Sequence, residues 1–218
     1  MTDFQELYHK ADVKEYRQYI LADQQNQLWE NYAALNQSVS HPNTVFAGDS
    51  ITEYFPIHEL LQSRLPLYNR GVHGINSLQL LEHLDTQILD LAPSNVFLLI
   101  GVNDLKTRTP KEVCQTIETM ISKIHAQLPE TQIFLLSIFP MNESPEFVRT
   151  PSLRDNQSIS QLNALLSQLA GERVQWLDVH DLLCDASGQL KREWTVDGLH
   201  LTIDGYRVIV DAIKSYLV

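Results

Sequence analysis

Five short apolar runs recur along the chain, and segments with helical periodicity separate them. The runs span residues 44–47, 67–72, 95–100, 132–139 and 174–179. The run at 95–100 is the most apolar, and a continuous apolar run bounded by turn signals is what a strand buried on both faces requires. Most links between the runs are too long for hairpins, so the strands are expected to lie parallel. The pattern predicts an α/β fold of three layers, α/β/α, with a doubly wound five-stranded parallel sheet in the middle.

The helical segments follow from apolar spacing and from the residues that break it. The spacing predicts helices over 57–64, 77–91, 110–128, 156–169 and 204–217. Residues 3 to about 40 predict a leading helix whose apolar face carries Leu21, Leu28, Tyr32, Leu35 and Val39. Such a face usually packs against its own chain, and a homodimer contact is the minority interpretation. We expect a single domain over 1–218, in which 1–40 is an N-terminal helical extension.

The charge of the chain limits its partners. Its 218 residues carry a formal net charge of −11, which disfavours nucleic acid and anionic membrane surfaces, because both require clustered Lys and Arg. No apolar run is long enough to span a bilayer, and the first residues lack the basic and then apolar order of a secretory signal. We expect a cytoplasmic protein without stable membrane insertion. Cys114 and Cys184 form neither a disulfide framework nor a metal-ligand spacing, and neither a metal nor a cofactor is expected.

The first apolar run ends in Gly48-Asp49-Ser50 and leads into a helical segment. Ser50 is therefore expected at the carboxyl end of a strand, which is the edge at which open α/β sheets bind ligands. Backbone N–H groups of a turn before a helix also stabilise negative charge. A serine in this position can act as a nucleophile if a histidine reaches it. The ordinary alternative is a turn in which Asp49 or Ser50 caps the following helix.

The second and third runs also end in glycine turns that carry polar residues. The second leads into Gly71-Val72-His73-Gly74, and two glycines three residues apart indicate backbone that closely approaches a neighbouring turn or a ligand. We take the Gly74 N–H as a candidate oxyanion donor and His73 as a reserve candidate for the catalytic base, although a lone loop histidine is more often solvated. The third run leads into Gly101-Val102-Asn103-Asp104. The Asn103 amide is a further candidate donor, and the alternative is a turn or a helix cap.

Asp197 and His200 stand three residues apart, just before the last helical segment. A carboxylate at this spacing can orient an imidazole ring and stabilise its positive charge, which is the role of the third member of a Ser-His-Asp triad. Metal binding is the rival interpretation. A metal, however, would need further His, Cys or carboxylate ligands at short spacing, and the sequence places none nearby.

Residues 140–152 form the longest irregular segment of the sequence. The segment follows the carboxyl end of the fourth run, so it should overhang the same edge of the sheet. Met141, Phe147 and Arg149 are candidates for lining a substrate pocket. The alternative is a plain crossover connection, which a segment of this length also fits.

All of these turns fall on one edge of the predicted sheet. Because chance turns would be spread over both edges, this coincidence carries more weight than any single motif. It assembles Ser50 as nucleophile, His200 as base and Asp197 as the residue that orients the base. The Ser50 N–H, the Gly74 N–H and the Asn103 amide would serve as oxyanion donors.

Four sequence blocks also carry a resemblance to a known family. They are Gly48-Asp49-Ser50-Ile51, Asn69-x-Gly71-x-x-Gly74, Gly101-x-Asn103-Asp104 and Asp197-x-x-His200. In this order they resemble the four blocks of the SGNH hydrolase superfamily, also called GDSL esterases/lipases. The small size and the leading helix are similar to the bacterial branch related to platelet-activating-factor acetylhydrolase Ib catalytic subunits. The sequence departs from the family pattern at Ile51, where Leu is commonest, and at Ile75, where relatives often carry Asp.

The resemblance implies both a fold and an activity. The implied fold is a flavodoxin-like sheet of five parallel strands, and the implied triad is Ser50, Asp197 and His200 with Gly74 and Asn103 as oxyanion donors. The expected substrate is a small-molecule carboxylic ester with a short acyl or acetyl group. An O-deacetylase of acetylated carbohydrates would use the same machinery. A non-catalytic module that binds phosphate or a flavin at this edge is the alternative of another class, although phosphate cradles usually show a denser glycine loop.

Overall fold

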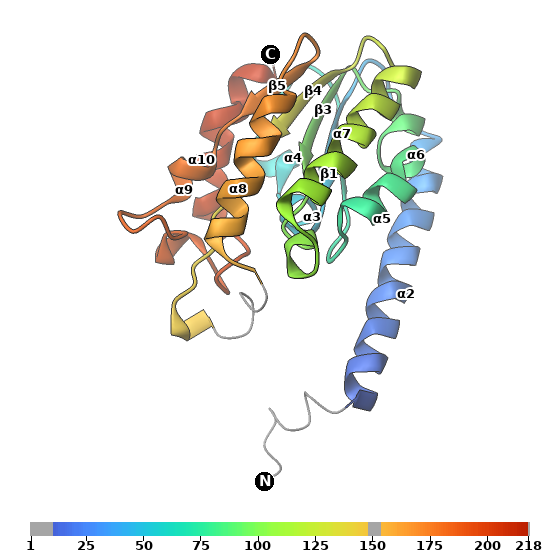
Figure 1. The fold of residues 1–218 in the computed structure, drawn as a ribbon. Coiled ribbons are helices and arrows are strands. Elements are labelled where there is room, and N and C mark those ends of the chain that lie inside the picture. Colours follow the sequence, from blue (N-terminus) through green and yellow to red (C-terminus); the bar gives the residue numbers. More distant parts are fainter. Residues whose placement is uncertain (1–10, 148–153, 218) are drawn as a thin grey trace.

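A single parallel sheet forms the centre of the molecule in this computed structural model, which describes residues 11–147 and 154–217 (Figure 1). The strand order is β2-β1-β3-β4-β5, and every pair of neighbours is parallel. The strands are β1 Thr44–Gly48, β2 Leu67–Gly71, β3 Asn95–Leu99, β4 Gln132–Leu136 and β5 Val174–Leu177. The predicted five-stranded parallel α/β fold is confirmed.

Helices connect the strands and cover both faces of the sheet. The α-helices are α2 Ala11–Asn36, α3 Ser50–Glu53, α4 Ile57–Leu60, α5 Ser77–Glu82, α6 Leu84–Gln87, α7 Pro110–Gln127, α8 Asn156–Leu166, α9 His180–Leu183 and α10 Ile203–Ile213. The 3-10 helices are η1 Leu89–Leu91, η2 Asp104–Lys106, η3 Pro145–Phe147, η4 Ser167–Leu169, η5 Arg192–Trp194 and η6 Lys214–Tyr216. Figure 1 shows α7 and α8 side by side in front of the strands.

Stacked aromatic rings fill the core on the face that α10 covers. Phe46, Phe97 and Phe134 occupy the same register on β1, β3 and β4, and the centroids of successive rings lie 4.7 Å apart. Tyr206 of α10 stacks on Phe55, whose ring meets Phe46 edge-on. Such offset stacking adds to the stabilisation that comes from burial of the rings. The core therefore holds α10 against the sheet, close to the turn that carries Ser50.

The contact face of the leading helix differs from the predicted one. Leu35 is 56% exposed, and Val39 lies beyond the end of α2. The buried face consists of Gln25, Trp29, Tyr32 and Asn36, of which only Tyr32 belongs to the predicted face, while Leu28 and Val39 are partly buried against the core. All four side chains donate hydrogen bonds to groups from Gly71 to Gln87, so polar groups line the contact and the apolar pattern does not reveal it.

Several other predicted boundaries also differ from the structure, and two of them differ for identifiable reasons. The predicted helix at 77–91 is divided into α5, α6 and η1, and the first interruption is at His83, whose ring stacks on Trp29 of α2. The fourth strand ends at Leu136 rather than at residue 139, because the side-chain amide of Asn163 binds both the N–H and the carbonyl of Ile138. None of the helices in the described part of the chain is long and apolar enough to cross a membrane.

Candidate active site

The turn between β1 and α3 places Ser50 at the first residue of a helix. Asp49 caps α3, since its side chain accepts a hydrogen bond from the Ile51 N–H at 3.0 Å. Gly48 permits this tight turn, because a Cβ there would lie 2.1 Å from the carbonyl oxygen of Leu99 on the neighbouring strand. Asp49 is therefore the helix cap, as the ordinary alternative expected, and the same turn presents Ser50 at the carboxyl edge of the sheet.

A continuous chain of hydrogen bonds joins Ser50, His200 and Asp197. Ser50 Oγ lies 2.9 Å from His200 Nε2, and His200 Nδ1 lies 2.7 Å from Asp197 Oδ2. The second carboxylate oxygen of Asp197 accepts the backbone N–H of His200 at 2.8 Å. A carboxylate that binds Nδ1 favours the tautomer with its proton on that nitrogen, which leaves Nε2 to accept the serine proton. The geometry thus suits activation of Ser50.

The two carboxyl groups near His200 differ in their electrostatics. Burial acts to raise the pKa of Asp197, but the hydrogen bonds from the side chain and backbone of His200 outweigh it and lower that pKa to about 2. Burial raises the pKa of Asp49 to about 6, against the opposing effects of the Ile51 N–H, His200 and Arg154. Asp197 is therefore a carboxylate at neutral pH and can stabilise an imidazolium.

The second and third strand ends meet beside this chain of hydrogen bonds. Gly74 has a φ of 75°, a backbone conformation that favours glycine, and Asn103 Nδ2 donates to the carbonyl of the adjacent Ile75 at 2.9 Å. The buried carboxylate of Asp104 accepts from both the N–H and the hydroxyl of Ser77, at 2.8 and 2.6 Å. These bonds tie the two loops together. The Asn103 amide nitrogen has two hydrogens, and only one of them is needed for the bond to the Ile75 carbonyl.

His73, the reserve candidate for the base, belongs to a different cluster. Its Nδ1 lies 2.9 Å from Glu53 Oε2, and its backbone N–H donates to the same carboxylate oxygen. Its carbonyl accepts a hydrogen bond from Gln25 of α2 at 2.8 Å. His73 is half-buried rather than solvated, and it links α2, α3 and the loop after β2.

The irregular segment supplies less of the site than predicted. Met141 is fully buried in the hydrophobic core, so the expectation that it lines an open substrate pocket is wrong. Phe147 is also buried and packs against Gly198, which stands between Asp197 and His200 in the sequence. Arg149 lies outside the described residues.

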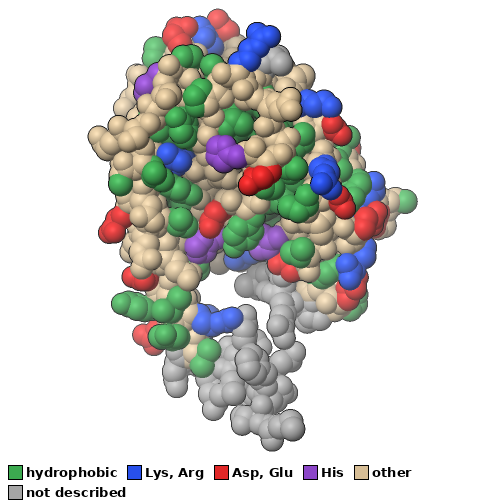
Figure 2. Space-filling model, turned by 180° about the vertical axis from the view of Figure 1, so that it is seen from behind, with side chains coloured by type: hydrophobic (Ala, Val, Ile, Leu, Met, Phe, Trp, Pro, Cys, Tyr) green, Lys and Arg blue, Asp and Glu red, His purple; other side chains and the backbone are tan. Residues whose placement is uncertain are grey.

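Two residues that the sequence did not single out border the site. Arg154, just before α8, donates from Nη2 to Asn103 Oδ1 at 3.1 Å. Tyr54 follows α3, is 51% exposed, and has its ring centroid 5.5 Å from that of His200. No periodicity or motif marks Arg154, whereas Tyr54 stands only four residues after Ser50. Figure 2 shows histidine side chains at the lower edge of the body, whereas acidic side chains are spread over this face.

A further group of polar side chains lies away from Ser50. His180, Asp181 and Cys184 bring one potential metal-ligand atom each within 4.8 Å of one another. His180 Nδ1 is already hydrogen-bonded to Asp181 at 3.0 Å, and the Asp181 side chain is 91% exposed. The sequence spacing of Cys184 gave no sign of this cluster.

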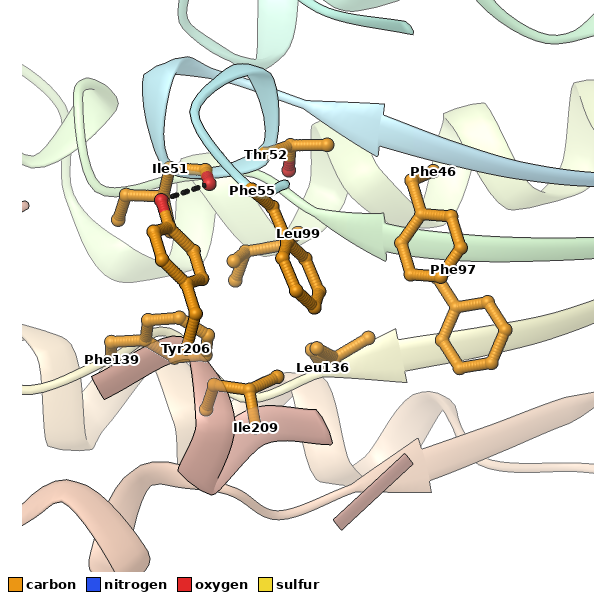
Figure 3. A pocket seen from close by; sticks show the side chains of 10 residues that line it. All are labelled: Phe46, Ile51, Thr52, Phe55, Phe97, Leu99, Leu136, Phe139, Tyr206 and Ile209. Atoms are coloured by element: carbon orange, nitrogen blue, oxygen red, sulfur yellow. Dashed lines mark hydrogen bonds between the residues drawn. The ribbon is translucent and has the colours of Figure 1, made fainter. Parts of the chain in front are cut away.

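A small apolar cavity lies on the core side of the Ser50 turn (Figure 3). Its volume is about 20 Å³, which is room for about one water molecule, and its apolar lining disfavours water. The Tyr206 hydroxyl beside it donates to the Ile51 carbonyl at 2.7 Å and so joins α10 to the Ser50 turn. The cavity is a packing feature and too small for a substrate. Its lining residues are Phe46, Ile51, Thr52, Phe55, Phe97, Leu99, Leu136, Phe139, Tyr206 and Ile209.

Comparisons with known proteins identify the family of the chain. The sequence model of the GDSL-like lipase/acylhydrolase family matches residues 46–208. Platelet-activating factor acetylhydrolase IB subunit alpha2 of Rattus norvegicus is 27% identical over 191 residues, which cover 86% of this chain and 81% of that protein.

Solved structures show the same architecture. A Streptococcus pneumoniae protein named for platelet activating factor is 38% identical, covers 96% of this chain and 100% of its own, and superposes with a TM-score of 0.91. The acetylxylan esterase Axe2 of Geobacillus stearothermophilus is 18% identical, with 82% of this chain and 95% of that one covered and a TM-score of 0.65. At that identity the likeness to Axe2 concerns the fold alone.

Proposed function

The chain belongs to the GDSL-like lipase/acylhydrolase family, and from this premise we propose that it is a serine esterase that cleaves short-chain acyl or acetyl esters through an acyl-enzyme. The observation that best supports the proposal is the pair of contacts of His200. One nitrogen of its ring lies 2.9 Å from Ser50 Oγ and the other lies 2.7 Å from Asp197. A serine paired with a base that a third group orients is the arrangement that activates a weak nucleophile.

The proposed reaction has two halves. In the first, His200 Nε2 takes the Ser50 proton while Ser50 Oγ attacks the ester carbonyl, and His200 then gives that proton to the departing alcohol. In the second, His200 takes a proton from water, the hydroxide adds to the acyl group, and Ser50 regains its proton as the acid leaves. Asp197 keeps its negative charge and stabilises the imidazolium in both halves.

The negative charge of each tetrahedral intermediate requires donors. We assign this role to the N–H groups of Ser50 and Gly74 and to the hydrogen of Asn103 Nδ2 that does not bind Ile75. The N–H of Ser50 lies at the start of α3, where backbone donors point toward an anion without further rearrangement. Donors held in place in this way stabilise the transition state more than the uncharged ester.

The surroundings of the site bear on the alcohol part of the substrate. Arg154 and Tyr54 make the surroundings of Asn103 and His200 polar. A polar alcohol fits these features, and the short acyl group is what the family resemblance implies. Esters of acetylated carbohydrates share both properties, so a carbohydrate O-deacetylase is the second candidate.

An ester panel on the wild type and on Ser50→Ala tests the proposal. We expect the wild type to hydrolyse p-nitrophenyl acetate, with rates that fall as the acyl chain lengthens, and to be labelled by an organophosphate. Ser50→Ala should lose both turnover and labelling while its melting temperature is kept. Labelling of another residue would show that the nucleophile is misassigned. A wild type that turns over no ester but retains phosphate or a yellow flavin would favour the binding module instead.

Acetylated xylan or peptidoglycan fragments, compared with simple acyl esters, distinguish the two candidate substrates. A higher kcat/KM for the acetylated carbohydrates would favour the O-deacetylase. The cytoplasmic location and the homodimer stay predictions, which cell fractionation and light scattering of the purified protein would test.

A further inference from the structure

The helix that follows β5 carries three side chains that can ligate a metal. Cys184 caps the carboxyl end of α9, the short helix that begins with His180 and Asp181. Each of these three residues offers one ligand atom, and the three atoms lie within 4.8 Å of one another. In the described part of the chain, no other group of three or more His, Cys, Asp or Glu side chains comes this close together. The fold therefore concentrates metal-ligating chemistry at this one place among the described residues.

The separations between these atoms are close to those of a tetrahedral zinc site. His180 Nδ1 lies 3.0 Å from Asp181 Oδ1 and 3.6 Å from Cys184 Sγ. Zinc bonds of about 2.0–2.2 Å to nitrogen and oxygen and about 2.3 Å to sulfur, at tetrahedral angles, set nitrogen about 3.4 Å from oxygen and about 3.6 Å from sulfur. The Asp181 carboxylate would also have to lie about 3.6 Å from Cys184 Sγ. Its side chain is 91% exposed, so it can rotate to that position without disturbing the core.

The hydrogen bonds of the cluster leave its ligand atoms able to take a metal. His180 Nε2 is buried and has no hydrogen-bond partner among the described residues. Because no bond at Nε2 fixes the tautomer, the ring proton can move from Nδ1 to Nε2, and Nδ1 then presents its lone pair. The Cys184 thiol donates to the Gly188 carbonyl at 3.6 Å, which is a weak bond. On metal binding the thiol would release its proton to solvent, and the metal–sulfur bond would replace that hydrogen bond.

The charges around Cys184 favour a cation. Burial raises the pKa of the Cys184 thiol, and the nearby carboxylates of Asp181, Asp185 and Asp178 raise it further, whereas Lys191 lowers it. The carboxylates thus outnumber the single ammonium group that opposes them. A divalent cation would offset this excess of negative charge, and a thiol that coordinates such an ion is deprotonated.

We propose that His180 Nδ1, Asp181 and Cys184 Sγ bind a zinc ion, with water in the fourth position. An imidazole, a carboxylate and a thiolate are the ligand types that Zn²⁺ takes in proteins, whereas Mg²⁺ and Ca²⁺ bind through oxygen. Neither Ser50 nor His200 belongs to the cluster, so the ion would be structural and its binding is independent of the proposed function.

The ion would fasten the loop that follows α9. Cys184 and Leu190 face each other in an isolated antiparallel bridge at the two ends of this loop. The Leu190 N–H donates to the Met141 carbonyl at 3.0 Å, and the Leu190 carbonyl accepts the side-chain amide of Asn142 at 2.7 Å. Zinc at Cys184 would therefore stabilise the loop where it joins the segment after β4.

Titration of the full-length protein with Co²⁺ tests the site. The protein is first treated with a chelator, and Co²⁺ then serves as a coloured substitute for Zn²⁺, because a thiolate ligand gives a charge-transfer band in the near ultraviolet. Added Zn²⁺ competes for the same position. The test variants are Cys184→Ser, His180→Gln and Asp181→Asn. Cys114→Ser and His58→Gln remove the same chemical groups outside the cluster and are the matched controls.

We expect the wild type to bind one equivalent of Co²⁺ with the thiolate band, Zn²⁺ to abolish that band, and Zn²⁺ to raise the melting temperature. Cys184→Ser should lose the band, and His180→Gln and Asp181→Asn should each weaken the binding of Zn²⁺ about tenfold or more. Both controls should bind as the wild type does. Because the Asp181 side chain is exposed, Asp181→Asn should keep the melting temperature of the metal-free protein, so it tests binding without a risk to folding.

A wild type without the thiolate band, or a band that persists in Cys184→Ser, would overturn the zinc site. The same conclusion would follow if Asp181→Asn bound Zn²⁺ as tightly as the wild type, or if Cys114→Ser lost the band. Failure of the site is distinct from failure of the proposed function. Ser50→Ala should bind Co²⁺ as the wild type does, and hydrolysis of p-nitrophenyl acetate by the metal-free wild type tests the esterase separately.

Discussion

Two histidine–carboxylate pairs lie at the same edge of the sheet, and they differ in what the second ring nitrogen reaches. His200 and Asp197 are 2.7 Å apart, and His73 and Glu53 are 2.9 Å apart. The two histidine side chains are 23% and 20% exposed, so burial does not separate them. His200 Nε2 lies 2.9 Å from Ser50 Oγ, whereas His73 Nε2 is buried and has no hydrogen-bond partner in the described part of the chain. A carboxylate beside a histidine is therefore insufficient to identify a base.

The difference follows from what each pair connects. Asp197 and His200 belong to one short loop before α10, and this loop is free to face the β1–α3 turn. Glu53 lies on α3 itself and binds both the ring and the backbone of His73, while Gln25 of α2 holds the His73 carbonyl. The His73–Glu53 pair thus connects α2, α3 and the loop after β2. The predictions below test this division between a catalytic pair and a structural pair.

The largest expected effect separates the two histidines. His200→Ala should lower kcat on p-nitrophenyl acetate by on the order of ten-thousand-fold or more, since Ser50 would lose its base. His73→Ala, the matched variant, should keep kcat within about tenfold but lose about 1–2 kcal/mol of unfolding free energy, because a half-buried hydrogen bond is removed. Steady-state rates and urea unfolding measure both. The reverse pattern would exchange the roles of the two pairs.

The two carboxylates should differ in the same direction. Asp197→Asn should lower kcat by on the order of a thousandfold or more, because an amide cannot stabilise the imidazolium and favours the wrong tautomer. Glu53→Gln keeps a side-chain oxygen for the His73 N–H, so we expect its kcat to change by less than about tenfold. Rates of both variants at saturating substrate check this. A Glu53→Gln enzyme as slow as Asp197→Asn would contradict the division.

Asn103→Ala tests the oxyanion role that we assign to the Asn103 amide, which would act together with the His200–Asp197 pair. Removal of one oxyanion donor should cost on the order of 3 kcal/mol of transition-state stabilisation, which lowers kcat about a hundredfold. The exposed Asn31 of α2 provides the same substitution away from the site, and Asn31→Ala should leave kcat unchanged. Near-normal turnover by Asn103→Ala would refute its assignment.

The smallest effect concerns Asp49, whose charge interacts with that of His200. Burial raises its pKa to about 6 in the folded protein, above its value in the unfolded chain. The folded state then holds the proton more tightly, so stability is lost as the pH rises through this range. Asp49→Asn should remove that loss and gain on the order of 2 kcal/mol at pH 7. Melting temperatures of the wild type and of Asp49→Asn, measured between about pH 4 and pH 7, check this prediction.

The control for this prediction is Asp90→Asn, which changes an exposed carboxyl group. It should leave the slope of melting temperature against pH unaltered. If Asp49→Asn had the same slope as the wild type, burial of the Asp49 carboxyl would not govern the pH dependence of stability.

Some of the site was predictable because it is local in sequence. Ser50 and Asn103 each stand three residues after the end of an apolar run, and Asp197 and His200 share one short loop, so strand ends and spacing were enough to select them. Parallel strands then require that the carboxyl ends meet at one edge. Arg154 gave no such signal, because it enters the site from the far side of an irregular segment and its contact with Asn103 is long-range.

The sequence by itself determined the strands, their parallel arrangement and the chemical groups at their ends, because apolar runs and breaking residues act over a few neighbouring positions. Only the tertiary structure decided which histidine faces Ser50, which face of α2 is buried and that Arg154 reaches Asn103. Those outcomes depend on side chains that lie far apart in the chain, and no local pattern records the distance between them. The same physical reason explains why a polar contact face, such as that of α2, escapes a search for apolar periodicity.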